Sequence, residues 1–123
     1  MKTVYLMVGS NSADAARKVA QAVEALRGEI DVFVSEPIVS PDYTGAGPDY
    51  LNVVVKAATD LTEARLKELA LTIENDLGRD RVLEKSSPGQ IIIDVDVVVY
   101  DGKILKFNEF DSEPFKRVFN NKI

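Results

Sequence analysis

The sequence contains no cysteine, no histidine and no tryptophan among its 123 residues. The absence of cysteine excludes disulfides, thiolate metal sites and a cysteine nucleophile, and the absence of histidine excludes a Ser-His triad. Any bound metal must therefore be held by oxygen ligands, which favours Mg²⁺, Mn²⁺ or Ca²⁺ over zinc. The chain also lacks an apolar run of the roughly 18 residues that a membrane span requires.

Positive charge is scarce as well, because 15 lysines and arginines stand against 20 aspartates and glutamates, for a net charge of −5. This balance argues against a broad electrostatic grip on nucleic acid. The N-terminus has a lysine but no apolar segment followed by small residues, so it does not resemble a signal peptide. We therefore expect one globular, cytoplasmic domain over residues 1–123, with no membrane association and no obligate protein partner.

Hydrophobic periodicity predicts four strands and two helices. The strands are expected at residues 3–9, 30–36, 50–59 and 91–100, and the helices at 12–27 and 61–78. The Asp-Gly pair at 101–102 predicts a hairpin after the last strand. This order predicts an α+β fold, a ferredoxin-like βαββαβ sandwich with an antiparallel sheet and two helices on one face.

The segments between these elements differ in composition. Residues 37–48 hold three prolines and two glycines, and so long a loop in a small domain is expected to be functional. A polar loop is expected over residues 79–90. The tail from Asn108 is ambiguous, with a helical turn at EPFKRVF as one interpretation.

The last predicted strand, IIIDVDVVVY, carries two charges in an apolar run. Aspartate is rare in strands, and burying a carboxylate is costly unless it is paired. Because strand side chains alternate, Asp94 and Asp96 point to the same face, with their Cα atoms roughly 6.5–7 Å apart. This spacing suits one or two hard cations. The alternatives are solvent exposure or a charged edge that prevents aggregation.

Other side chains suit a site for phosphate and a heterocycle. Arg79 and Arg81 directly follow the second predicted helix, and Glu74 lies at the border of its buried face. Arginine can bind phosphate through two parallel hydrogen bonds. Tyr50 and Asn52 share a strand face, where an aromatic ring and an amide can recognise the plane and the edge of a heterocycle. For each residue alone, a solvated charge or a satisfied core side chain is the alternative.

Five motifs follow one another along the chain: YLMVGSN, SP, PDYLN, IENDLGRDR and DVDVVVYDG. As an ordered set they resemble the 6-hydroxymethyl-7,8-dihydropterin pyrophosphokinase family, whose typical pattern is LGSN, TP, YLN, E-x-x-x-GR-x-R and LDLDI. The resemblance extends over roughly residues 3–105. It implies that the protein transfers the terminal diphosphate of ATP to the hydroxymethyl oxygen of the pterin in folate biosynthesis, and releases AMP.

The resemblance also implies roles for individual residues. Asp94 and Asp96 match the family's metal-binding aspartates, which hold two Mg²⁺ ions around the phosphates. Arg79, in the loop that follows the second predicted helix, is grouped with them as catalytic. The expected pterin-site residues are Ser40, Tyr50, Asn52 and Phe119. The expected ATP-site residues are Glu74, Arg81 and Arg117. The loops at 37–48 and in the 80s are expected to close over the cleft.

Within this pterin site, Asn52 is expected to read the edge of the ring and Phe119 to stack on it.

The chain departs from the family pattern just before the paired aspartates and in the tail. Where the family carries a Trp and GPRT, this sequence has KSSPGQIII, with Ile91 in place of an arginine, and Asp111 replaces a family histidine. Lys85, Lys116 and Lys122 are candidates to replace the lost positive charge. The alternative function is a non-catalytic pterin- or nucleotide-binding module on the same fold. A third possibility is diphosphate transfer to another heterocyclic alcohol.

Overall fold

The computed structural model describes residues 1–41, 47–86 and 90–120, so the centre of the 37–48 loop, part of the 79–90 loop and Lys122 lie outside the described residues. The elements within these ranges are β1 (Lys2–Ser10), α1 (Ala15–Arg27), β2 (Asp31–Val34), β3 (Ile38–Ser40), β4 (Tyr50–Thr59), α2 (Glu63–Asp76), α3 (Arg81–Ser86), β5 (Asp94–Tyr100), β6 (Lys103–Ile104), α4 (Phe107–Phe110) and α5 (Glu113–Asn120). No helix among them is both long and apolar enough to cross a membrane.

The strands form one sheet in the order β2-β4-β1-β5-β6, and β3 also pairs with β4. Every pairing is antiparallel. Strand β1 is central, since it pairs with β4 from Lys2 to Ser10 and with β5 from Val4 to Gly9. The predicted α+β class with an antiparallel sheet is therefore confirmed.

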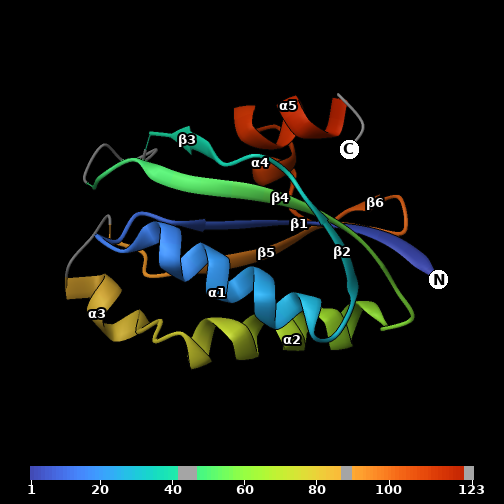
Figure 1. Cartoon of the computed structure of the whole chain (residues 1–123), viewed down its shortest axis with the longest axis horizontal. Helices are drawn as coiled ribbons and strands as arrows, with labels where there is room; N and C mark the ends of the chain where they lie inside the picture. Colours follow the sequence, from blue (N-terminus) through green and yellow to red (C-terminus); the bar gives the residue numbers. More distant parts are fainter. Residues whose placement is uncertain (42–46, 87–89, 121–123) are drawn as a thin grey trace.

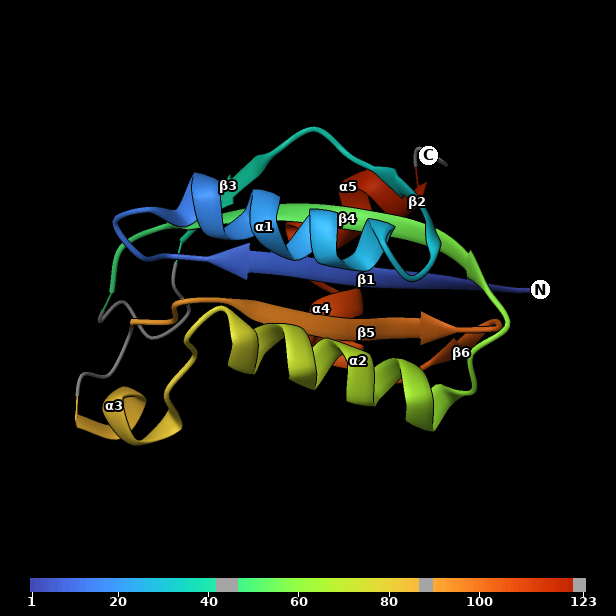
Figure 2. The same ribbon diagram turned by 60° about the horizontal axis from the view of Figure 1, so that its bottom comes forward.

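Helices cover both faces of this sheet. Figure 1 shows α1 and α2 on one face and the C-terminal helices α4 and α5 on the other. Figure 2 shows α1 along β1 and β4, whereas α2 lies along β5. The prediction placed two helices on one face and left the tail open, and the structure adds a second helical layer made by that tail.

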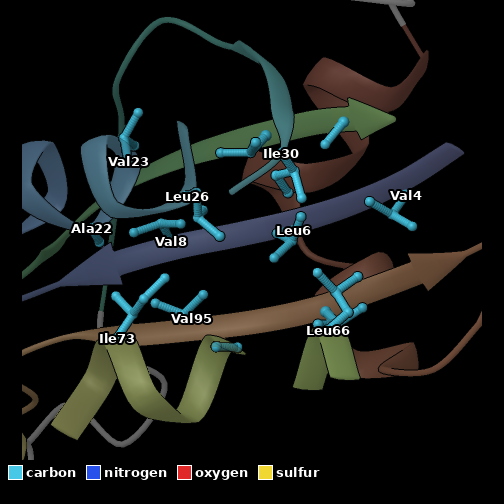
Figure 3. Close-up of a cluster of buried hydrophobic side chains, with 14 of the residues drawn as sticks. Val4, Leu6, Val8, Ala22, Val23, Leu26, Ile30, Leu66, Ile73 and Val95 are labelled. Atoms are coloured by element: carbon cyan, nitrogen blue, oxygen red, sulfur yellow. The ribbon is translucent and has the colours of Figure 1, made fainter. Parts of the chain in front are cut away.

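The larger hydrophobic core lies between the sheet and helices α1 and α2. Alternation along β1 directs Val4, Leu6 and Val8 into it, where they meet Leu26 of α1 and Leu66 of α2 (Figure 3). Burying a side chain of this size contributes about 1.5–3 kcal/mol, so this layer fixes the sheet on which the functional residues stand.

A smaller, aromatic core lies under α4 and α5. Phe115 is completely buried and packs edge-on against Tyr5 at a ring-centroid distance of 6.0 Å. Phe119 stacks on Phe115 at 5.5 Å and also meets Phe110 at 5.2 Å. The i, i+4 spacing of Phe115 and Phe119 places both rings on one side of α5, which explains why the ambiguous tail is helical.

Two expected loops contain regular structure. Strand β3 occupies part of the predicted 37–48 loop, and α3 occupies part of the predicted 79–90 loop. Each is too short for a periodic hydrophobic signal, and β3 is bounded by Pro37 and Pro41. The predicted hairpin is confirmed, because Asp101 (φ 49°) and Gly102 (φ 83°) both adopt the left-handed conformation of a two-residue turn.

The aromatic core predicts a clear contrast between two phenylalanines of the C-terminal region. Phe115→Ala is expected to lower the free energy of unfolding by about 3–5 kcal/mol, because it opens a cavity in a completely buried cluster. Phe107→Ala is the matched control, since that ring is 66% exposed, and its effect should stay within about 0.5 kcal/mol. Urea denaturation measures both, and equal losses would contradict this view of the tail.

Candidate functional site

A cavity of about 550 Å³, here called the sheet cavity, opens between the sheet and the α4–α5 segment. Its floor is made by strand residues, and its wall by the residues around α4 and α5. The described lining residues are Met7, Gly9, Ser40, Pro41, Tyr50, Asn52, Asp94, Asp96, Glu109, Asp111, Ser112, Glu113 and Pro114. Three of the four residues expected to bind a heterocycle, Ser40, Tyr50 and Asn52, therefore lie together here.

A second cavity of about 420 Å³, here called the edge cavity, lies along the outer edge of β5 beside α2. Its described lining residues are Lys67, Ala70, Leu71, Glu74, Arg79, Arg81, Asp94, Val95, Asp96, Val97 and Lys106. The residues expected at an ATP site, Glu74 and Arg81, line this cavity. Strand β6 pairs with Val99 and Tyr100, so no strand within the described ranges pairs with the beginning of β5 at this edge.

Asp94 and Asp96 are the residues that the described linings of the two cavities share. They stand on β5 opposite Gly9 and Met7 of β1, on the face away from α1 and α2. Asp94 and Asp96, which were predicted to share one face of the strand, thus lie at the boundary between two ligand-sized cavities.

The two cavities differ in charge. Five carboxylates line the sheet cavity, and no lysine or arginine is among its described lining residues. Four cations line the edge cavity, which are Lys67, Arg79, Arg81 and Lys106. The edge cavity is therefore the better place for an anion, and the sheet cavity for a neutral or cationic group that donates hydrogen bonds.

Arg79 is the centre of a partly buried ion cluster. Its Nη1 atom donates to Oε2 of Glu74 and to Oδ1 of Asp94, each at 3.0 Å, and its Nε donates to Oε2 of Glu84 at 2.8 Å. Burial by itself lowers the pKa of Arg79, but the carboxylates of Glu84, Asp94 and Glu74 raise it well above its usual range. Arg79 thus stays charged and joins α2, α3 and β5.

Glu74 connects this cluster to the open edge of the sheet. Its Oε2 accepts a hydrogen bond from the backbone N–H of Val95 at 2.8 Å, and its Oε1 accepts one from Arg81 at 3.1 Å. Burial raises the pKa of Glu74, although the Val95 N–H and the charge of Arg79 oppose the rise. The carboxylate takes the place that a neighbouring strand would have at this edge.

Asp96 is held in an unfavourable position. Its side chain is only 12% exposed, and its nearest cation is Lys106, whose Nζ lies 4.0 Å from Oδ1. Burial raises the pKa of Asp96 to about 8, the charges of Asp94 and then Glu109 add to the rise, and Lys106 opposes it. Two carboxylates forced together by a rigid strand are a donor set that fits a hard divalent cation.

Ser40, Asn52 and Gly9 form a tight arrangement on the floor of the sheet cavity. The Asn52 Nδ2 group donates to Ser40 Oγ at 2.8 Å and to the Ile38 carbonyl at 3.2 Å. A Cβ atom on Gly9 would lie 2.6 Å from Asn52 Oδ1, so glycine is required for this close approach. The Asn52 amide donors therefore hold β3 in place in this structure.

Two residues expected at the site lie outside both cavity linings. Phe119 packs in the aromatic core with Tyr5 and Phe110, and Arg117 is exposed. The helical periodicity of α5 turns Phe119 toward the sheet and Arg117 toward solvent. Among the lysines expected to replace lost charge, Lys85 and Lys116 line neither cavity.

The sequence interpretation missed three contributors. Asn11 is buried and accepts from the Ile91 N–H at 2.7 Å, while its Nδ2 donates to the Pro48 carbonyl at 3.3 Å, so it joins the ends of two long loops. Glu84 was expected in a plain polar loop. Lys106 belongs to the segment ILKF, for which the sequence suggested only a short edge strand. The predicted hairpin places it beside Asp96, because the chain folds back there.

The fold and the site define a class of protein: a small α+β fold with two ligand-sized cavities that meet at paired aspartates. Comparison of the sequence is more specific: the chain belongs to the 7,8-dihydro-6-hydroxymethylpterin-pyrophosphokinase (HPPK) family, whose family model matches residues 5–120. The resemblance inferred from the five motifs is therefore confirmed.

Several relatives support this membership. The 2-amino-4-hydroxy-6-hydroxymethyldihydropteridine pyrophosphokinase of Methylorubrum extorquens is 37% identical over 106 residues, which cover 83% of this chain and 65% of that protein. The Aquifex aeolicus protein of the same name is 28% identical over 108 residues, covering 86% and 66%. The folic acid synthesis protein FOL1 of Dictyostelium discoideum is 30% identical over 112 residues, covering 88% and 16%. The chain thus spans about 65% of the Methylorubrum relative and far less of FOL1.

The ion cluster predicts different effects for two neighbouring arginines. Arg79→Met is expected to lower the free energy of unfolding by about 3–5 kcal/mol, because it leaves buried Glu74 and its neighbours without their shared cation. Arg81→Met is the control, because Arg81 binds the same carboxylate but its side chain is 56% exposed, and a loss below about 1 kcal/mol is expected. Similar losses in chemical denaturation would show that Arg79 is not the centre of the cluster.

The raised pKa of Asp96 predicts a pH-dependent gain of stability on substitution. Between its usual value near 3.8 and about 8, the folded protein binds more protons at this group than the unfolded chain does, so the native state loses stability as pH rises. Asp96→Asn removes this loss. In EDTA, the variant should nearly match the wild type at pH 4 and exceed its unfolding free energy by several kcal/mol at pH 9.

The control for this measurement is Asp31→Asn, because Asp31 is exposed on β2. Added Mg²⁺ is expected to raise the melting temperature of the wild type and not that of Asp96→Asn. A gain that is the same at pH 4 and pH 9 would contradict the burial of charge at Asp96.

Proposed function

We propose that the chain transfers diphosphate from ATP to 6-hydroxymethyl-7,8-dihydropterin and releases AMP. We further propose that residues 1–123 form one domain with a ferredoxin-like βαββαβ arrangement. The strand order β2-β4-β1-β5 and the position of α1 and α2 on one face support this arrangement. Family membership and the names of the relatives support the activity.

One observation of the site carries the proposal: Asp94 and Asp96 line both cavities. A transfer between two bound substrates needs the donor and the acceptor to meet at one point, where charge on the moving group is neutralised. The paired aspartates stand at the boundary between a cation-lined space and one without cations among its described lining. A site for a single ligand would not require this division.

The charges of the cavities assign the two substrates. The nucleotide lies in the edge cavity, where Arg81 and its neighbours face the phosphates and where Glu74 is part of the wall. The pterin lies in the sheet cavity against Tyr50, with its ring donors toward the carboxylates. Asn52 and Ser40 shape the floor there.

In the reaction, the hydroxymethyl oxygen of the pterin attacks the β-phosphorus of ATP. The new oxygen–phosphorus bond forms as the bond from that phosphorus to the oxygen of the α-phosphate breaks, and AMP leaves with the electron pair. The hydroxyl proton is released to solvent or to a nearby carboxylate. Bound Mg²⁺, which we place as two ions at Asp94 and Asp96, supplies neutralisation of phosphate charge.

Within this scheme Arg79 holds Asp94 in position, and Asn11 joins the ends of the two long loops. Phe119 and Arg117 would contact substrate only if α5 moved, because neither residue is in the described lining of either cavity. We therefore retain them as family-derived proposals that depend on such a movement.

A non-catalytic binding module is the second candidate. The observation that favours it is that Arg79 pairs with three protein carboxylates. Its charge is therefore largely neutralised, and the four cations of the edge cavity offer a phosphate less positive charge than their number suggests. Such a module would bind pterin or nucleotide without forming AMP.

The activity is tested by incubating the protein with ATP, Mg²⁺ and 6-hydroxymethyl-7,8-dihydropterin and measuring AMP. We expect AMP formation that depends on the pterin, and a fall of on the order of 100-fold in Asp94→Asn, which removes a carboxylate at the point of transfer. Asp101→Asn is the control, since it makes the same change at the exposed hairpin after β5.

Pterin binding by calorimetry without AMP formation would exclude the kinase and favour the binding module. AMP formed only with a different heterocyclic alcohol would correct the acceptor and retain the reaction class.

A further inference from the structure

Lys106 stands out among the four cations of the edge cavity because its ion pair is the weakest. Arg79 is shared by three carboxylates, Arg81 Nη2 lies 3.1 Å from Glu74, and Lys67 Nζ lies 3.1 Å from Glu63. The Lys106 ammonium lies 4.0 Å from Asp96 Oδ1, which is the longest ion pair recorded for the described residues. It is therefore the cation most easily redirected to a ligand.

The backbone of Lys106 is fixed although its ammonium is half-exposed. The N–H of Leu105 donates to the Val98 carbonyl at 2.8 Å, and that of Lys106 reaches the same oxygen at 3.4 Å. Lys106 then precedes the first residue of α4. The hairpin thus fixes the backbone of Lys106 beside the edge cavity, while its long side chain can change conformation.

We propose that Lys106 binds the polyphosphate of the nucleotide, in the place of cations that the family pattern has and this sequence lacks. The inference rests on the proposed function and adds a residue to its nucleotide site. A divalent cation held by Asp96 would neutralise the charge that pairs with Lys106, which would leave the ammonium available in the same cavity that receives the phosphates. A lysine ammonium is a compact charge with three donors, which suits phosphate oxygens.

The alternative role of Lys106 is to shield Asp96 without touching a ligand. The two roles differ in how they depend on the number of phosphates. A phosphate-binding lysine strengthens the binding of ATP much more than that of AMP, whereas a shielding lysine affects both nucleotides alike, through the aspartates or the fold.

The experiment measures the dissociation constants of ATP and AMP by calorimetry in Mg²⁺ without pterin. For Lys106→Gln, we expect the dissociation constant of ATP to rise about tenfold, as for the loss of one charge-assisted contact, and that of AMP to change less than twofold. Lys106→Arg should restore most of the ATP affinity. Lys103→Gln is the control, because Lys103 lies on the same hairpin, pairs with Glu63 and lines neither of the two cavities.

Each other outcome overturns the inference in a distinct way. If the wild type binds ATP and Lys106→Gln binds it equally well, Lys106 does not contact phosphate, while the proposed function stands. If ATP and AMP weaken equally, Lys106 acts by shielding. If the wild type neither binds ATP nor forms AMP with pterin, the proposed function fails and the inference fails with it.

Discussion

The site depends on one interaction, the hydrogen bond that the buried carboxylate of Glu74 accepts from the backbone N–H of Val95. Strand β5 ends its pairing with β6 early, so the backbone N–H of Val95 needs a partner at the open edge, and Glu74 provides it from α2. Burying that carboxylate requires a cation, which is Arg79, and Arg79 in turn holds Asp94. One unpaired strand edge thus determines which helix, which loop and which aspartate are locked together.

The arrangement of charge separates a cavity suited to an anion from a cavity suited to a neutral or cationic group, and a single cavity would bind both kinds of group poorly. Cations lie at the sheet edge, carboxylates lie over the sheet face, and the paired aspartates stand between them. Asp96 is buried at the expense of stability, as its raised pKa indicates. Such a cost is typical of functional sites, where residues are selected for ligand binding rather than for the stability of the ligand-free fold.

The sequence was sufficient to predict the long helices and strands and the common face of Asp94 and Asp96. Periodicity and alternation report directly on which side chains are buried. It was insufficient for β3 and α3, which are too short to show a period. It left the tail ambiguous, where the structure packs Phe119 of α5 into the aromatic core. Glu84 and Lys106 escaped notice because single charges carry no pattern, and their importance follows only from the neighbours that the fold gives them.

The central position of β1 has a consequence for how the protein is made. Strand β1 precedes both of its partners, β4 and β5, which follow about 40 and 85 residues later in the chain. The nascent chain therefore carries an apolar strand with two open edges until β4 and β5 have left the ribosome. We expect the sheet to form only after β5 has been synthesised, with slow closure by distant pairing and a need for protection of β1 in the interval.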